Sequence, residues 1–424
     1  MANQSCKDRT GHSGIATALV ATGILLSRIA GLVRERVFAH FFGNTMAADA
    51  FRAAIRIPNF LQNLFGEGVL SASFIPVYSQ LLQRRQTEQA KALANAVAGI
   101  MGLLISILVL VGLVAAPILT DLFAPGFAGQ KRQLTITLVR ILFPGTGILV
   151  LSSLCLGILN SHGRFFLSYA APVLWNLAII ASLIYLGPRT ELPALAAFTA
   201  WGAVIGSILQ IGIQLPHAIR LASLYRPSLS FRTQGVRDVL TNAIPVTISR
   251  GIVQVSGYID SIIASFLPTG AVSALGYAQT LYLLPVSLFG MSVSAAELPA
   301  LSRETGQAER QLEQVRARLQ AGIRRILLLI APSVSGLVGL GDVVVCAIYR
   351  SGRFGPDDAR YVWAILAVAC IGLPASTLSR LYCAAFYAHK DTRTPLRYAV
   401  IRVLTSTLLA ILLAIYLPKI LRLA

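Results

Sequence analysis

The chain has 424 residues, of which 55% are hydrophobic and 12% are charged, and its mean hydropathy is +0.71. A soluble protein of this length does not need so apolar a composition, so these values exclude the soluble classes. The formal net charge of +19 would suit a nucleic-acid-binding protein, but most basic residues lie in short segments between apolar runs. That placement is typical of membrane topology and of anionic lipid headgroups, so we expect no nucleic-acid partner.

Apolar runs of about 20 residues recur from end to end, which predicts an all-α, polytopic membrane protein with no separate soluble domain. We expect about eleven transmembrane helices. They cover residues 14–34, 44–66, 92–120, 134–159, 166–187, 193–215, 239–267, 272–298, 323–349, 360–388 and 396–417. Segment 69–83 is expected to continue the second of them past a kink at Pro76. Lysines and arginines are more frequent in the connections on the N-terminal side, which predicts a cytoplasmic N-terminus.

Residues 24–68 combine the first two predicted spans with five arginines and only three acids. The arginines are Arg28, Arg34, Arg36, Arg52 and Arg56, and the acids are Glu35, Asp49 and Glu67. An ionised group at bilayer depth costs at least roughly 2.5–3.5 kcal/mol, so it usually faces a watery cavity or a partner. Because guanidinium matches phosphate oxygens, the surplus positive charge predicts a phosphate pocket within the membrane. The alternative is a solvated turn at residues 34–36, with Arg52 and Arg56 reaching an interface.

The chain resembles itself at an offset of roughly 223–230 residues, as in transporters built from repeats. SASFIPVYSQ (71–80) matches SAAELPALSR (294–303), and two further segments match in the same order. The copies have the same orientation, which predicts two parallel-repeat lobes around a central cavity. The expected division is an N-lobe of residues 1–215, a cytoplasmic linker of residues 216–238 and a C-lobe of residues 239–424. The last helix of the usual repeat is expected to be missing from the C-lobe.

The sequence contains no nucleotide-binding loop and no H-E-x-x-H motif, and its cysteines are scattered without CxxC pairs. We therefore expect no cofactor and no metal site. Transport would then draw on a Na+ or H+ gradient, on the membrane potential or on removal of the cargo. Asp260 lies within a predicted span, where an acid binds a coupling cation, pairs with Arg250 or makes a buried hydrogen bond. Arg250 lies about 15 Å away along the same predicted helix, too far for direct contact without a kink.

An ordered set of short strings resembles the MurJ (MviN) lipid II flippases of the multidrug/oligosaccharidyl-lipid/polysaccharide exporter superfamily. The strings are SRIAGLVRE (27–35), FFG (41–43), ADAF (48–51), RIPN (56–59), FGEG (65–68), FIPVYS (74–79), APGF (124–127), residues 142–165, QLPH (214–217), ASFL (264–267) and FYAHKDTRTP (386–395). Each string is weak alone, but together they are specific and cover nearly the whole chain.

The resemblance implies a flippase of the bacterial inner membrane that works by alternating access and moves lipid II. We expect this lipid and the membrane lipids as partners, and a monomeric protein. The residues that match the family's cavity pattern are Arg28, Arg34, Asp49, Arg56 and Glu67. Asp260, Asp391 and Thr407 match positions suited to a sodium site, because their oxygens suit a hard cation. Asp391 is equally explained as a loop acid or a helix cap.

The chain departs from the family pattern where basic residues are usual. Gln62 and Asn63 follow the PN pair, and Gln279 and Thr280 replace an acidic-basic pair. Arg52 lies one helical turn before Arg56, so it can replace part of the lost charge.

Two other functions remain open. A relative in the same superfamily would move another lipid-linked oligosaccharide, an exopolysaccharide intermediate or an amphipathic drug, and the lost charges favour it. A membrane enzyme acting on prenyl pyrophosphates would need clustered acids for magnesium near the arginines, and no predicted span contains them.

Overall fold

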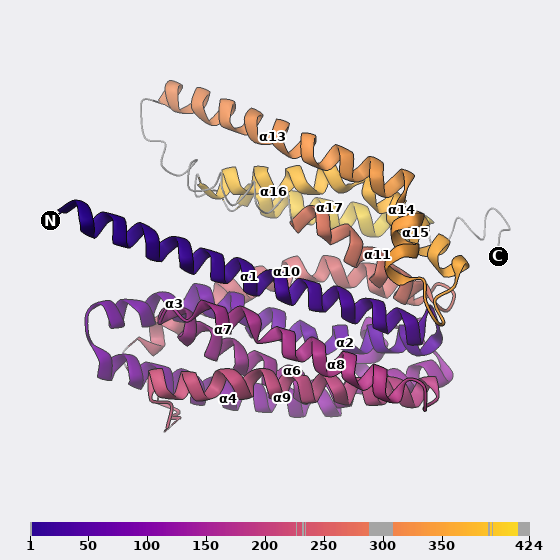
Figure 1. Cartoon of the computed structure of the whole chain (residues 1–424), viewed down its shortest axis with the longest axis horizontal. Coiled ribbons are helices and arrows are strands. Elements are labelled where there is room, and N and C mark those ends of the chain that lie inside the picture. Colours follow the sequence, from indigo (N-terminus) through magenta and orange to yellow (C-terminus); the bar gives the residue numbers. More distant parts are fainter. Residues whose placement is uncertain are drawn as a thin grey trace. The chain divides into compact units, whose positions relative to one another are not determined.

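The structure is a computed structural model that describes residues 2–225, 227–230, 233, 235–287, 308–388, 391 and 393–413. In these residues the regular structure is helical throughout, apart from an isolated bridge between Ser351 and Phe354. Long helices dominate the chain (Figure 1). The predicted all-α class is therefore confirmed.

The first helices are α1 (Ala2–Phe42), α2 (Met46–Phe65), α3 (Glu67–Gln83), α4 (Thr87–Val114), α5 (Ala116–Phe123), α6 (Gly129–Ser161), α7 (Phe165–Ala170), α8 (Pro172–Leu186) and α9 (Leu192–Ala222). They are followed by α10 (Val236–Ser265), α11 (Ala271–Pro285), α13 (Ala308–Gly339), α14 (Gly341–Tyr349), α15 (Pro356–Ile371), α16 (Leu373–Ala388) and α17 (Arg393–Ile411).

Five helical segments of the described chain are long and apolar enough to cross a membrane, or six if the bent pair α15–α16 forms one span. The five are residues 87–114, 129–161, 165–186, 192–222 and 316–339. A polytopic membrane protein is thus confirmed, whereas the count of eleven is not. One physical reason lies in α2, where Asp49, Arg52 and Arg56 reduce the mean hydropathy of the segment. A break between α2 and α3 at Gly66 also shortens it.

The chain packs into two compact units. Unit 1 comprises Met1–Phe41 and Met46–Phe266, and unit 2 comprises Phe42–Thr45 and Leu267–Ala424. In unit 1, α6 packs against α2, α4 and α9, and α10 packs against α2 and α3. In unit 2, α11 packs against α15, and α13 packs against α15 and α16.

The predicted lobes were defined by sequence repeats, whereas the two units are defined by which helices pack together. The boundaries of the units therefore do not test the predicted lobes. Packing assigns α10 to unit 1, whereas the repeats assign residues 239–424 to the C-lobe. The second copy of the repeated segment, residues 294–303, lies outside the described residues. The parallel-repeat arrangement therefore stays a prediction.

The segment between α9 and α10 is attached to α4. The Asn95 side chain donates a hydrogen bond to the Ser223 carbonyl at 3.1 Å, and the Ser228 amide donates one to the Asn95 carbonyl at 3.1 Å. Ala222 and Val236, at the ends of the two helices, are buried in the same core as Leu93 of α4. Residues 216–222, the first part of the predicted linker, continue α9.

Candidate functional site

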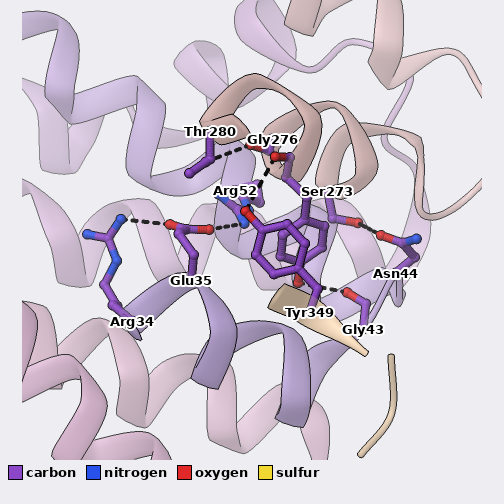
Figure 2. Close-up of polar contacts among 10 residues, drawn as sticks. Arg34, Glu35, Gly43, Asn44, Arg52, Ser273, Gly276, Thr280 and Tyr349 are labelled. Carbon is purple, nitrogen blue, oxygen red and sulfur yellow. Dashed lines mark hydrogen bonds and ion pairs between the residues drawn. The ribbon is translucent and has the colours of Figure 1, made fainter. Parts of the chain in front are cut away.

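Three charged residues of α1 and α2 meet in unit 1 (Figure 2). Glu35 is buried on α1, and one carboxylate oxygen accepts a hydrogen bond from Arg34 Nη2 at 2.7 Å. The other oxygen accepts one from Arg52 Nη2 on α2. Two guanidinium groups thus share one carboxylate, so the cluster keeps a net positive charge. Sequence analysis identified both arginines as candidates, whereas Glu35 was not among the proposed binding residues.

Aromatic rings also contact these two arginines. The Arg34 guanidinium carbon lies 4.9 Å from the centre of the Trp175 ring on α8, and that of Arg52 lies 5.0 Å from the centre of the Phe38 ring on α1. A guanidinium over an aromatic face is stabilised by the ring quadrupole, more strongly where water is excluded. The rings therefore help to hold the two arginines in place.

Arg28 and Arg36 are exposed on α1, whereas Arg56 is half-buried on α2. Arg28 precedes Arg34 by six residues, or about 9 Å along the helix axis. The Arg56 carbonyl accepts a hydrogen bond from the Tyr258 hydroxyl of α10 at 2.9 Å. The Arg56 guanidinium lies within electrostatic range of Asp260.

Asp49 is fully buried in the first turn of α2 and forms an ion pair with Lys131. Their Oδ2 and Nζ atoms are 2.7 Å apart, and Lys131 Nζ lies 4.0 Å from the centre of the Phe127 ring. Asp49 was a candidate cargo-binding residue from the sequence, whereas Lys131 was not singled out there. Because the partners are 82 residues apart, no local pattern could have identified the pair.

Glu67 is exposed in the first turn of α3, immediately after the break at Gly66. It interacts electrostatically with Arg250, which reaches this break from α10. A Cβ atom on Gly68 would lie only 1.8 Å from the Arg250 guanidinium carbon. The guanidinium group therefore rests directly on Gly68, a position where any side chain would displace it.

The three proposed coupling-ion residues are divided between the units. Asp260 is an exposed residue of α10 in unit 1, whereas Asp391 and Thr407 belong to unit 2. Asp391 Oδ1 accepts hydrogen bonds from the backbone amides of Arg393 at 2.9 Å and Thr394 at 3.1 Å. Hydrogen bonds from the side chain and backbone of Thr394, followed by that of Arg393, lower the pKa of Asp391.

Asp391 therefore has the geometry of a cap at the start of α17, which was one of its two explanations. The Thr407 hydroxyl is enclosed and has no hydrogen-bond partner among the described residues. Among the described residues, no group of three or more His, Cys, Asp or Glu side chains is placed to hold a metal ion.

Unit 2 contains a separate polar cluster around residues 42–45, the connector between α1 and α2. The Asn44 side-chain amide donates a hydrogen bond to Asp358 at 3.0 Å, and its carbonyl oxygen accepts one from the Ser273 hydroxyl at 3.3 Å. The Tyr277 hydroxyl donates to the Gly43 carbonyl at 3.1 Å. Sequence analysis did not anticipate this cluster.

Gly43 has a φ of +53°, and a Cβ atom there would lie 2.8 Å from the Arg353 carbonyl oxygen. Only glycine accommodates both the left-handed backbone and this close approach. Buried rings of Tyr277, Tyr349 and Phe354 surround the connector, with the Tyr277 ring 5.1 and 5.3 Å from the other two.

Gln62 and Thr280, two positions at which the sequence departs from the expected family pattern, make local backbone contacts in the structure. Thr280 donates its hydroxyl to the Gly276 carbonyl of its own helix at 3.0 Å (Figure 2). Gln62 lies one turn before Gly66, whose amide donates to the Gln62 carbonyl at 2.8 Å. Thr280 therefore provides no charge, and Arg250 of α10 brings a cation to the α2–α3 break.

Comparison with known proteins gives a consistent result. The family model described as "Lipid II flippase MurJ" matches residues 38–421. A probable lipid II flippase MurJ of Vibrio cholerae is 32% identical over 400 residues, covering 92% of this chain and 75% of the relative. A lipid II flippase MurJ of Burkholderia cenocepacia is 33% identical over 382 residues, covering 89% and 73% respectively.

Solved structures show the same fold. A lipid II flippase MurJ in an inward closed conformation superposes with a TM-score of 0.79 at 27% identity, covering 93% of this chain and 81% of the other. An inward-facing multidrug transporter of the MATE family, in the MOP superfamily, gives a TM-score of 0.70 at 15% identity. It covers 91% of this chain and 87% of the other, and at that identity the likeness concerns the fold alone.

Proposed function

Because this chain belongs to the lipid II flippase MurJ family, we propose that it translocates lipid II, an undecaprenyl-pyrophosphate-linked peptidoglycan precursor, by alternating access. The observation that carries the proposal is the cluster of Arg34, Glu35 and Arg52, which keeps a net positive charge within helices α1 and α2. Guanidinium groups in such a place suit pyrophosphate, because they offer paired donors with fixed geometry. The protein acts in this role as a transporter and not as an enzyme.

The residues of unit 1 divide into two roles in this proposal. Arg28, Arg34, Arg52 and Arg56 supply the positive field that attracts the pyrophosphate. Among these, Arg34 and Arg52 are already ordered by Glu35 and by aromatic rings. Asp49 acts through its ion pair with Lys131, because its carboxylate is fully buried and cannot contact a cargo in this conformation.

Energy coupling through Na+ or H+ remains part of the proposal, with Asp260, Asp391 and Thr407 as the candidate residues. A cation drives the cycle only by binding one conformational state better than the other. Two observations favour Thr407 and Asp391. The enclosed Thr407 hydroxyl is without a hydrogen-bond partner in the described chain, and Asp391 retains acceptor capacity beyond its two backbone contacts. The membrane is proposed to be the bacterial cytoplasmic membrane, with the N-terminus cytoplasmic and the protein monomeric.

Complementation of a strain conditionally depleted of its own MurJ tests the cargo directly. The wild-type chain is expected to restore growth and lipid II flipping, whereas Arg34→Ala and Arg52→Ala are expected to fail while still inserting normally. Arg189→Ala serves as the control, because that arginine is exposed and stacks on Tyr185 of its own segment. A wild-type chain that inserts but does not flip lipid II would contradict the proposal.

A second cargo deserves comparison because Gln62 and Thr280 lack the charge usual in the family. Another lipid-linked oligosaccharide, an exopolysaccharide intermediate or an amphipathic drug would need fewer cationic contacts. Flipping assays with lipid II and with such cargoes in the same proteoliposomes separate the two proposals. Preference for lipid II would favour the first, and transport of the alternative cargo alone would favour the second.

A further inference from the structure

We propose that the face formed by α3 and α10 in unit 1 is a further binding subsite for the head group, with Arg250 contacting a phosphate and a neighbouring polar pocket taking the sugar. The inference rests on the proposed function, because it concerns how the same cargo is held. Arg250 was considered in the sequence only as a partner for Asp260, and the structure gives it a different neighbourhood.

The position of Arg250 is fixed by the packing of α10 on the break between α2 and α3. The Thr247 hydroxyl donates a hydrogen bond to the Leu64 carbonyl at 3.4 Å, and a Cβ atom on Gly251 would lie 3.4 Å from Leu64. Arg250 lies between Thr247 and Gly251 in the sequence, and its guanidinium group contacts Gly68. Two neighbouring residues of α10 therefore anchor the helix where this side chain reaches the break.

The Arg250 guanidinium is more available to an anion than those of Arg34 and Arg52. Its residue is exposed, and it makes no hydrogen bond or close ion pair with any residue that the structure describes. Glu67 interacts with it only electrostatically, whereas Glu35 binds the other two arginines directly. Arg250 therefore offers donors that a phosphate can take without displacing a buried carboxylate.

The last turns of α2, residues 57–65, contain no basic residue of their own. Gln62 and Asn63 are neutral, and the break at Gly66 follows Gln62 by about one helical turn. Arg250 brings a guanidinium to this break from a different helix. A positive charge is thus present beside the end of α2, and α10 supplies it.

A polar pocket of about 620 Å³ lies further along the same two helices. Its polar lining consists of Ser79, Gln80 and Gln83 from α3 and of Asp238 and Asn242 from α10. Gly68 contacts Arg250, whereas the later part of α3 meets the beginning of α10, so the helices run antiparallel. Asn242 precedes Arg250 by eight residues, or about 12 Å along the axis.

Amides, a hydroxyl and a carboxylate are the groups that hydrogen-bond to sugar hydroxyls and N-acetyl groups, because they offer both donors and acceptors. A phosphate on Arg250 and a sugar in the pocket would thus be held along one helix pair. The separation of about 12 Å is spanned by a pyrophosphate and its first sugars, whereas a free phosphate would occupy only the Arg250 end.

The test uses the purified full chain in nanodiscs and compares the binding of lipid II with that of undecaprenyl pyrophosphate, which has no sugar. Arg250→Gln is expected to weaken both ligands by about 10-fold or more, the scale of one charge-assisted contact. Asn242→Ala is expected to weaken lipid II by about 5-fold and to leave undecaprenyl pyrophosphate unchanged. Arg237→Gln removes a charge from the same helix away from the break, and is expected to have no effect.

Gly68→Ala tests whether the position of the Arg250 guanidinium matters as well as its charge. The added methyl group displaces the guanidinium but leaves its positive charge in the protein. This variant is expected to weaken both ligands as Arg250→Gln does, while Arg250→Lys keeps part of the affinity as a point charge. Unchanged affinity in Arg250→Gln, with normal folding, would overturn the phosphate contact. An equal effect of Asn242→Ala on both ligands would overturn the sugar pocket. If wild-type protein binds neither ligand, the proposed function itself fails.

Discussion

The two units use different interactions around their polar clusters. In unit 1 the contacts are ionic, with Glu35 between Arg34 and Arg52. In unit 2 the connector around Asn44 is held by single hydrogen bonds and buried aromatic rings, as at Tyr277. A buried ion that loses its partner keeps its full desolvation penalty, whereas a lost hydrogen bond leaves a smaller one. The comparison therefore predicts that unit 1 is the more sensitive to loss of a single polar group.

The largest effect is expected from Glu35→Gln, which leaves the guanidinium groups of Arg34 and Arg52 without their shared carboxylate. Removing one partner of a buried ion pair typically destabilises a protein by about 3–5 kcal/mol. Urea or thermal unfolding of the purified chain in detergent measures the loss. Glu88→Gln provides the control, because its pair with Lys91 is exposed on one helix and contributes only about 0.3–0.5 kcal/mol. Equal losses in the two variants would contradict the assignment.

Lys131→Met is expected to have the next largest effect. The substitution retains an apolar chain against Phe127 but removes the cation that faces the fully buried Asp49 carboxylate. We expect a loss of about 3 kcal/mol in the free energy of unfolding. Adding Asp49→Asn should recover part of it, because the remaining buried group is then neutral. Double-mutant cycle analysis would detect that coupling, and strictly additive losses would argue against a direct pair.

Tyr277→Phe addresses unit 2 and is expected to destabilise it by about 1–1.5 kcal/mol. The ring and its contacts with Tyr349 and Phe354 remain, whereas the hydrogen bond to the Gly43 carbonyl is lost. Tyr398→Phe is the matched control, since Tyr398 is 68% exposed on α17. A loss as large as that of Glu35→Gln would remove the distinction between the units.

The smallest effect is expected from Arg132→Gln, at an exposed ion pair. The hydrogen bond from Arg132 lowers the pKa of Asp121 below its ordinary value of 3.8. A carboxyl group with a lowered pKa stabilises the folded state above its unfolded pKa, and this contribution disappears as the pH falls through the folded pKa. The difference between the unfolding midpoints of wild type and variant should thus be constant near neutral pH and vanish in acid. A difference that grows in acid would contradict it.

The helical class and the membrane location could be predicted from the sequence, because each follows from composition or local pattern. Arg34 and Arg52 stood out as charges within apolar segments, and they do meet in the structure. Their shared partner Glu35 also has a local signal, because it is the acid next to Arg34 on α1. Asp391 shows a similar local signal, because an acid two residues before Arg393 is placed to cap α17.

The remaining contacts could not be predicted because they join distant parts of the chain. Lys131 and Asp49 are separated by 82 residues, and Asn44 and Asp358 by 314. A pairing over such distances depends on which helices pack together, and helix periodicity carries no information about that choice. Arg250 illustrates the same point, since its distance from Gly68 follows only from the antiparallel packing of α3 and α10.

The connector at residues 42–45 has a consequence for dividing the protein into pieces. A chain cut after Phe266 yields a first fragment that still carries four residues of unit 2. In such a fragment, Asn44 would present the amide that binds Asp358 and the carbonyl oxygen that binds Ser273, both of which belong to the second fragment. The connector would then serve as a recognition element between separately synthesised halves. A cut within residues 227–230 would instead place α10 on the second fragment. It would thereby separate α10 from the helices of unit 1 against which it packs.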